Sequence, residues 1–326
     1  MKLRHAAVLA LAAAALLAGC ARKAETDQVL KFSIVPAEDQ VSMGRVWQPL
    51  LDDLNKQTGL KVEASYASNY MGMIEAMRFH QVQVGWFSAL PALEAVNRAD
   101  AEVLGRIVDK GGDGGVYESV LITRKGSGIT LDSLLKCGKR YNFGLGDPNS
   151  TSGTLAPLAY LFAPRGIDPT DCFKTVRSAS HQANLLGVGY GTVDVATANT
   201  VTLVYARRQN PEIADKIEVI WKSPPLPESS ILVRKDVDPA IKEKLKRFFI
   251  TYGTATGAEG DHERQVLDGL TYGGFKPVDA SYLDPIRLMV ASKDLNEARH
   301  GGDAAKIAAA KTAFDAINAK PSAHAG

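Results

Sequence analysis

The sequence has almost no excess of charge of one sign. Its 326 residues contain 38 lysines and arginines and 36 aspartates and glutamates, which gives a formal net charge of +2. These charges are spread along the chain, so they form no broad basic surface for nucleic acid or an anionic membrane. A site for an anion would therefore have to be local and built from a few residues.

Sequence signatures of several enzyme classes are also missing. No glycine-rich phosphate loop ending in lysine occurs, and the glycines of residues 187–191 end a predicted helix instead of following a strand, so they form no dinucleotide fingerprint. His262 has no second histidine at the spacing of a zinc-binding helix, and His80, His300 and His324 are isolated. We therefore expect no cofactor and no metal.

The apolar run at the N-terminus is too short to be a membrane-spanning helix. It covers residues 6–18 and follows Lys2 and Arg4, whereas a spanning helix needs roughly 20 apolar residues. A short basic start before such a run is typical of a secretory signal peptide.

Small residues just before Cys20 resemble the lipobox of bacterial lipoproteins. This resemblance implies that residues 1–19 are a lipoprotein signal peptide and that Cys20 is lipid-modified. The protein would then be lipid-anchored to the membrane on its periplasmic or cell-surface side, with residues 20–28 as a tether.

Cysteine is scarce, with three in the whole chain. Beyond the lipobox, Cys137 and Cys172 remain. In an oxidising compartment this pair could form a disulfide, and two separate buried thiols are the alternative.

Predicted strands and helices alternate along the rest of the chain, which is the pattern of an α/β protein. Apolar runs at 30–35 and 60–66 flank a helical pattern at 44–58, and the alternation resumes after residue 125. We expect two α/β lobes joined by two crossings, with a ligand cleft between them. The predicted parts are lobe 1 at 29–121 plus 232–300, lobe 2 at 122–231, and a C-terminal helix and tail at 301–326.

The segment with the strongest chemical signal is residues 146–153, Gly-Asp-Pro-Asn-Ser-Thr-Ser-Gly. It follows a predicted strand and leads into a predicted helix, whose N-terminus offers unpaired N–H groups and partial positive charge. Ser150, Thr151 and Ser152 add hydroxyl donors without adding charge. The segment suits an oxyanion, although a capped helix start with a turn is the simpler alternative.

Several segments in the same order resemble the phosphonate-binding proteins of ABC importers. The resemblance covers roughly residues 31–288, and its segments are Tyr70 with 75–79, Trp86-Phe87, 147–153, Ser180-His181, 193–197 and 221–224. It implies a periplasmic binding protein fold and delivery of a small phosphorus oxyanion to an ABC permease and ATPase complex, without catalysis.

The same resemblance assigns roles to individual residues. Ser150, Thr151 and Ser152 would hold the oxygens bound to phosphorus, and His181 would donate from the start of its helix. Tyr70 would donate from the other lobe.

Two further positions are expected at the cleft. Phe87 stands where the family often has a tyrosine, so it would contribute shape but no hydrogen bond. Asn199 follows the strand at 193–197 and is expected to point into the cleft.

Two departures from the family bear on the ligand. Val201 and Ser229 stand where members that resemble aminoalkylphosphonate binders carry acids, and a buried ammonium without a carboxylate partner is unfavourable. The sequence therefore predicts a ligand without a cationic tail, such as phosphite, hypophosphite, phosphate or a short alkylphosphonate. This expectation takes Glu228 to be a solvated loop residue.

Two other functions are compatible with parts of the sequence. Ser150, His181 and Asp194 could be combined into a hydrolase triad, but such enzymes place one serine between glycines in a strained turn, unlike this run of hydroxyls. A ligand-binding sensor lipoprotein of the same fold is the second alternative.

Overall fold

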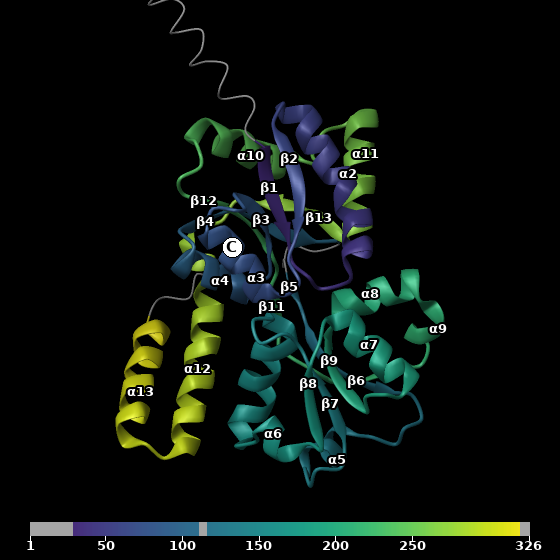
Figure 1. Ribbon diagram of the computed structural model, residues 1–326, viewed down its shortest axis with the longest axis vertical. Coiled ribbons are helices and arrows are strands. Elements are labelled where there is room, and N and C mark those ends of the chain that lie inside the picture. The colour runs from purple at the N-terminus through teal and green to yellow at the C-terminus, as the bar shows by residue number, and fades with distance from the viewer. Residues whose placement is uncertain (1–28, 111–115, 320–326) are drawn as a thin grey trace, which may run out of the picture.

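The computed structural model describes residues 29–110 and 116–319. The predicted signal peptide, Cys20 and the tether lie outside these residues. Among the described helices, none is both long and apolar enough to cross a membrane. Figure 1 shows two α/β lobes, one above the other, each built around its own sheet, as the sequence predicted.

The first lobe contains a six-stranded sheet in the order β13-β4-β12-β3-β1-β2. β1 is parallel to β2 and β3, while β12 is antiparallel to its neighbours β3 and β4. The strands are β1 (Val29–Ile34), β2 (Lys61–Tyr66), β3 (Val84–Phe87), β4 (Ala101–Asp109), β12 (Ser230–Arg234) and β13 (Tyr272–Lys276).

The helices of this lobe bury their apolar residues against the sheet. In α2 the Asp39 side chain caps the N-terminus and Gly59, at φ 69°, ends the helix in the left-handed conformation. Trp47 packs on Phe32 of β1 with ring centroids 5.4 Å apart. The helices are α2 (Gln40–Thr58), α3 (Tyr70–Arg78), α4 (Ala89–Arg98), α10 (Pro239–Thr251) and α11 (Gly257–Leu270).

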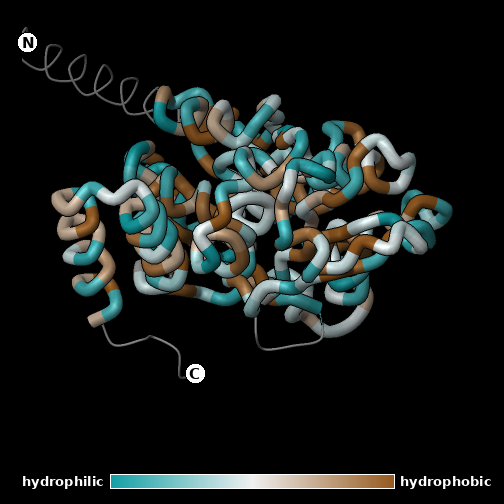
Figure 2. The backbone as a smooth tube through the Cα atoms, turned by 90° about the horizontal axis from the view of Figure 1, so that it is seen from below, coloured by the Kyte–Doolittle hydropathy of each residue, from teal (hydrophilic) through white to brown (hydrophobic). Residues whose placement is uncertain are grey.

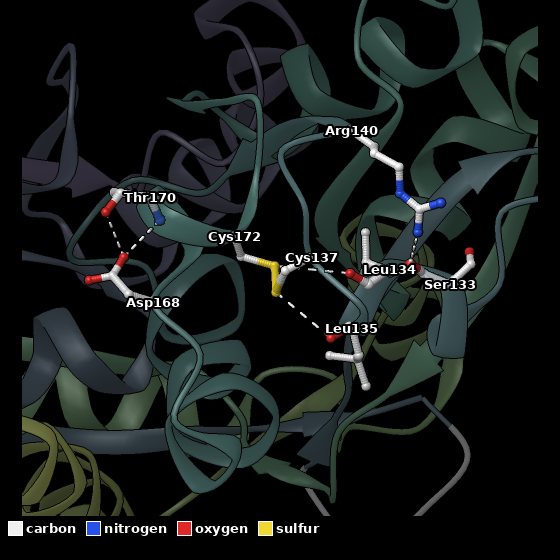
Figure 3. The surroundings of a disulfide bond; sticks show 8 residues. All are labelled: Ser133, Leu134, Leu135, Cys137, Arg140, Asp168, Thr170 and Cys172. Carbon is white, nitrogen blue, oxygen red and sulfur yellow. Dashed lines mark hydrogen bonds between the residues drawn. A yellow bond between two sulfur atoms is a disulfide. The ribbon is translucent and has the colours of Figure 1, made fainter.

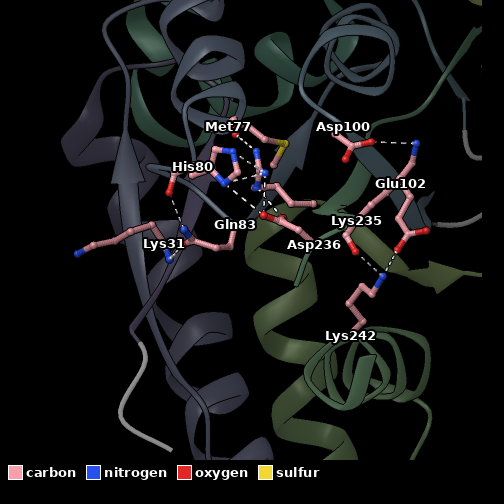
Figure 4. A network of polar contacts seen from close by, with 10 residues as sticks. Lys31, Met77, His80, Gln83, Asp100, Glu102, Lys235, Asp236 and Lys242 are labelled. Atoms are coloured by element: carbon pink, nitrogen blue, oxygen red, sulfur yellow. Dashed lines mark hydrogen bonds and ion pairs between the residues drawn. The ribbon is translucent and has the colours of Figure 1, made fainter. Parts of the chain in front are cut away.

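Side chains at the end of β12 and in the segment that follows it form a network of polar contacts with other parts of the first lobe (Figure 4). The buried Arg234 side chain donates to the Met77 carbonyl and to both oxygens of Asp236, the latter at 2.8 and 2.9 Å. Nearby, Lys242 Nζ donates to Glu102 Oε1 at 2.7 Å. These bonds hold the chain in place after it returns from the second lobe.

The second lobe contains a five-stranded sheet in the order β10-β6-β9-β7-β8. Phe143 of β7 stacks on Phe173 at 4.3 Å between ring centroids, and Phe162 meets Phe143 edge-on at 5.7 Å. The strands are β6 (Ser119–Arg124), β7 (Asn142–Leu145), β8 (Thr175–Ser178), β9 (Val195–Asn199) and β10 (Ile217–Lys222). The helices are α5 (Leu131–Leu135), π-helical η1 (Thr151–Leu155) and η2 (Pro157–Phe162), α6 (Pro169–Cys172), α7 (His181–Tyr190), α8 (Thr200–Gln209) and α9 (Pro211–Ala214).

A disulfide joins Cys137 to Cys172 in this lobe (Figure 3). It links the segment after α5 to the end of α6, with a sequence separation of 35 residues. Of the two arrangements left open by the sequence, the structure contains the bridged one.

Two short segments connect the lobes and pair with each other. β5 (Val116–Tyr117) and β11 (Leu226–Pro227) form an antiparallel ribbon between the sheets (Figure 1). β6 then begins at Ser119 in the second sheet, and β12 begins at Ser230 in the first. The prolines around residue 226 explain why the return segment contains so little regular structure.

The C-terminal helices lie to one side of the lobes. α12 (Asp284–Gly301) and α13 (Ala304–Asn318) pack on each other as a hairpin, which Figures 1 and 2 show at the edge of the molecule. α12 buries Ile286 and Met289, whereas α13 has no buried residue. The terminal helix α13 is therefore exposed along its whole length.

Candidate ligand-binding site

A small cavity lies between the two lobes. Its volume is about 50 Å³, which is room for a few water-sized groups. Residues of both lobes and of the crossing segments line it, among them Tyr70, Trp86, Ser150, Ser152, His181 and Asn199. The residues that line it include no lysine and no arginine.

The hydroxyl loop, residues 146–152, is shaped by a close backbone contact. The Gly146 N–H donates to the Gly153 carbonyl at 2.9 Å, and a Cβ on Gly146 would lie 2.5 Å from the Gly153 Cα. Glycine is therefore required at position 146. Ser150 caps the following helix, because its Oγ accepts from the Gly153 N–H at 2.9 Å.

The helix that follows the loop begins as a π-helix, η1. The Leu155 N–H reaches back five residues to the Ser150 carbonyl at 3.1 Å. Its first N–H groups have no acceptor within the helix, and they carry the partial positive charge of a helix N-terminus. The loop thus presents both hydroxyls and a favourable dipole to an anion.

His181 faces two of these hydroxyls. Its Nε2 lies 3.3 Å from Ser150 Oγ and 3.4 Å from Ser152 Oγ, and the side chain is 3% exposed. Burial lowers the pKa of His181 to about 4, so the imidazole is neutral near pH 7. A neutral imidazole donates one hydrogen bond, and an adjacent anion would raise its pKa.

Other side chains hold Ser152 in position. Asn199 Nδ2 donates to Ser152 Oγ at 3.1 Å, and Ser119 Oγ donates to the Ser152 carbonyl at 2.6 Å. Asn199 is itself fixed as the N-cap of α8, since its Oδ1 accepts from the Thr202 N–H at 2.7 Å.

Contacts across the cleft show that the lobes are closed. The Leu90 N–H of the first lobe donates to Thr151 Oγ1 at 2.8 Å. At the rim, Gln182 Nε2 donates to Asp39 Oδ2, and the Asp39 N–H donates to Gln182 Oε1, both at 3.0 Å. The cavity is therefore enclosed by an interface between the lobes.

The structure brings together five of the seven side chains that the sequence assigned to ligand binding: Tyr70, Ser150, Ser152, His181 and Asn199. Thr151 is fully buried beside the cavity and bonds to the first lobe instead of lining it. Phe87 is fully buried in the core, and its neighbour Trp86 lines the cavity. Successive side chains of a strand point to opposite faces, so only one of these two aromatics can face the cleft.

Asp194 does not join His181. Its Oδ2 accepts from the backbone N–H and the side-chain Nδ2 of Asn142, at 2.7 and 3.0 Å. The carboxylate ties two strands of the sheet together, so the structure contains no Ser-His-Asp relay at this site.

The expectation for Glu228 was wrong. The side chain is 5% exposed and lines the cavity instead of lying in solvent. The return crossing carries it inward, where the Ser229 N–H donates to its Oε2 at 2.7 Å and the Tyr282 hydroxyl donates to its carbonyl at 2.6 Å. Burial raises the pKa of Glu228 to about 7.

Sequence reasoning missed a second acid and three tyrosines. Glu38 lines the cavity from the loop before α2, and burial, together with Asp39, raises its pKa to about 8. Tyr117, Tyr205 and Tyr272 line it as well. None of the four belongs to a periodic pattern that points to the cleft, so the sequence carries no local signal for them.

Comparisons with known proteins agree with this arrangement. Residues 32–283 match the family model described as "ABC transporter, phosphonate, periplasmic substrate-binding protein". The chain is 39% identical to the phosphonates-binding periplasmic protein of Escherichia coli over 272 residues, which are 83% of this chain and 78% of that protein.

Two solved structures are similar in fold. One is a binding protein component of an ABC phosphonate transporter from Pseudomonas aeruginosa, with 35% identity and a TM-score of 0.85 over 89% of this chain and 96% of that one. The other is PhnD1 from Prochlorococcus marinus in complex with methylphosphonate, with 20% identity and a TM-score of 0.71 over 80% and 96% of the two chains. The latter likeness concerns the fold alone.

Proposed function

Since the chain belongs to the family of periplasmic substrate-binding proteins of phosphonate ABC transporters, we propose that Ser150, Ser152 and His181 bind the phosphorus-bound oxygens of its ligand. The protein is the substrate-binding component of an importer and not an enzyme. The observation that supports this site is the convergence of two hydroxyls and a neutral imidazole on one cavity at a helix start.

The donor set suits a phosphorus oxyanion. Hydroxyl, imidazole and backbone N–H groups can surround several oxygens at once without adding a fixed positive charge. Each hydrogen bond to a charged group contributes about 1.5–3 kcal/mol, so a few of them suffice for micromolar or tighter binding. Asn199 and Ser119 already hold Ser152 in place by hydrogen bonds in the free protein. Ligand binding therefore costs less conformational entropy of the Ser152 side chain.

Capture requires the lobes to open and close. Tyr70 of the first lobe is 3% exposed and lines the cavity with Ser150, and its backbone N–H donates to Asp147 Oδ2 of the hydroxyl loop at 3.4 Å. A ligand can reach this cavity only if such contacts separate. We propose that the β5–β11 ribbon is the hinge.

Lipid anchoring through Cys20 belongs to the same proposal. Leu17, Ala18 and Gly19 supply the small residues that processing requires before the cysteine. Cys20→Ser should release the protein from the membrane fraction, and unchanged membrane association of that variant would contradict the anchor.

The anion site is tested by calorimetric titration of methylphosphonate, phosphite and phosphate into the protein. We expect Ser152→Ala and His181→Ala each to weaken the tightest of these ligands by roughly ten- to a hundredfold, the loss of one hydrogen bond to a charged group. Ser133→Ala is the matched control, because Ser133 also lies in the first turn of a second-lobe helix but does not line the cavity. Unchanged affinity in both site variants, or no binding of any of the three anions by the unaltered protein, would refute the proposal.

A further inference from the structure

A second hollow adjoins the binding cavity between the lobes. It is a groove of about 440 Å³, lined by the start of α2 and the end of β2 in the first lobe and by the start of α7 in the second. Val35, Glu38 and Met43 line both the groove and the cavity, so these side chains form a shared wall. Other residues of the groove, Gln40 and Ser68 among them, are exposed. The groove therefore connects the protein surface with the wall of the cavity.

One pair of residues joins the lobes where the groove meets the cavity. The Asp39 N–H donates to Gln182 Oε1, and Gln182 Nε2 donates to Asp39 Oδ2, both at 3.0 Å. Asp39 and Gln182 line the groove, whereas the residues just before them in the chain, Glu38 and His181, line the cavity. The pair therefore lies at the border between the two hollows, one residue away from the anion site.

Both partners are held in place by the starts of their helices. Asp39 is the N-cap of α2, where its Oδ1 accepts from the N–H groups of Val41 and Ser42 at 2.9 and 3.0 Å, and Ser42 Oγ donates to its Oδ2 at 2.7 Å. These bonds, that of the Ser42 hydroxyl first, lower the pKa of Asp39 to about 2, so its side chain is a charged acceptor at neutral pH. Gln182 stands in the first turn of α7, which Ser180 caps.

The hydrogen-bond pattern of the pair requires an amide at position 182. Asp39 presents one donor, its N–H, and one charged acceptor, its Oδ2. Gln182 supplies the matching acceptor and donor. A carboxylate at position 182 would face the charge of Asp39, and an apolar side chain would form neither bond. The pair is therefore chemically complementary, and its two bonds form only when the lobes are together.

We propose that Gln182 is a gating residue: paired with Asp39 it closes the mouth of the cavity, and the ligand enters and leaves through the groove when this pair separates. This inference rests on the proposed anion site, since the molecule that is gated is the ligand of that site. Gln182 acts without touching the ligand. Because its bonds must break before the lobes part, they slow reopening and lengthen the time for which the ligand is held.

Stopped-flow measurement of ligand release tests the gate. Tryptophan fluorescence follows release, because Trp86 lines the cavity, and the probe is whichever of methylphosphonate, phosphite and phosphate binds most tightly. Gln182→Met keeps a similar side-chain length and removes both bonds, so we expect the dissociation rate constant to rise roughly three- to tenfold. Gln182→Glu places a second carboxylate beside Asp39 and should raise it by about tenfold or more.

Exchanging the chemistry of the two partners gives a readout that a merely structural role would not move. Asp39→Asn alone leaves an amide facing an amide, so two donors meet in either orientation of Gln182 and release should be faster. In the double variant Asp39→Asn, Gln182→Glu, the new carboxylate accepts from the new amide and from the N–H of residue 39, and asparagine still caps α2. We expect the double variant to release ligand at a rate within about threefold of that of the unaltered protein.

Gln40→Glu is the matched control, because Gln40 is exposed and lines the same groove. It adds the same charge near the mouth, which should slow association of an anion and leave the dissociation rate constant unchanged. Unchanged dissociation in Gln182→Met and Gln182→Glu overturns the gate, and so does an equal acceleration in Gln40→Glu. A double variant that releases ligand as fast as Gln182→Glu also overturns it. If Gln182→Glu does not fold, Gln182→Met, which introduces no charge, decides.

Small-angle scattering without ligand separates this inference from the proposed function. Gln182→Glu should have a larger radius of gyration than the unaltered protein, because repulsion from Asp39 favours open forms. If the anions bind but the Gln182 variants release them at the unaltered rate, the gate alone is overturned. If the unaltered protein binds none of the three anions, the anion site fails. Equal radii of gyration would then overturn the gate as well, whereas a larger radius in the variant would support it.

Discussion

Glu228 combines a structural cost with a role at the cavity. Glu228 is 5% exposed and lines the cavity together with Tyr117 and Tyr272, and the charge of Asp109 disfavours ionisation of its carboxyl group further. The Ser229 N–H offsets part of this cost. In the free protein the Glu228 carboxyl group therefore stays protonated up to a higher pH than an ordinary glutamate, since its pKa is raised to about 7.

This burial predicts how stability depends on pH. Because the folded protein raises the pKa of Glu228 from 4.5 to about 7, the folded state holds a proton that the unfolded chain releases. The resulting stability is present below pH 4.5 and is lost as pH rises through 7. Glu228→Gln removes this contribution. As pH rises from 4.5 to above 7, the free energy of unfolding of this variant should therefore increase relative to that of the unaltered protein by about 3 kcal/mol.

Urea unfolding at several pH values between 4.5 and 8 measures this difference, with Glu243→Gln, the same change at an exposed position on α10, as the control. A constant difference between Glu228→Gln and the unaltered protein would show that Glu228 is not buried as the structure has it.

Among the elements of secondary structure, the alternation of strands and helices was the part most readily predicted from the sequence. Strands near residues 30–35 and 60–66 and the helix between them follow from apolar spacing. A helix was also predicted after the hydroxyl loop, from Leu155 onward, and the structure begins it four residues earlier, at Thr151. The π-helical form of that start was not predictable, because it depends on how Gly146 and Gly153 approach each other.

The site was predictable where it lies on a local motif and not elsewhere. Residues 150–152 stand at a helix start, which a sequence reveals through capping residues, whereas His181 was assigned through the resemblance to the family. Glu228 lies between β11 and β12, in a crossing without regular period, so nothing local indicates which way its side chain points. The choice between Trp86 and Phe87 depends on the register of β3, which pairing with β1 and β12 determines.

The disulfide between α5 and α6 stabilises the second lobe at a distance from the cavity. In the loop-entropy model, a bridge closing 35 residues contributes about 3–4 kcal/mol. We expect the double variant Cys137→Ala, Cys172→Ala to lose stability of that order in urea unfolding. Its affinity for methylphosphonate should be unchanged, because neither cysteine lines the cavity. Full stability of the variant, or weakened binding by a folded variant, would contradict this account.

At the scale of the whole molecule, the binding site exists only when both lobes meet. Tyr70 and Leu90 of the first lobe contact Asp147 and Thr151 of the second. We expect ligand to shift the protein from open toward closed forms, so small-angle scattering should show a smaller radius of gyration at saturating ligand. The same titration with the Ser152→Ala, His181→Ala double variant is the control. No compaction of the unaltered protein would indicate a rigid, preformed pocket.

A crystal structure of the protein grown with methylphosphonate tests the central claim most directly. The account predicts that phosphorus-bound oxygens lie within hydrogen-bond distance of Ser150 Oγ, Ser152 Oγ and His181 Nε2. Phosphorus bound outside this cavity, or inside it without contact to these three groups, would contradict the account.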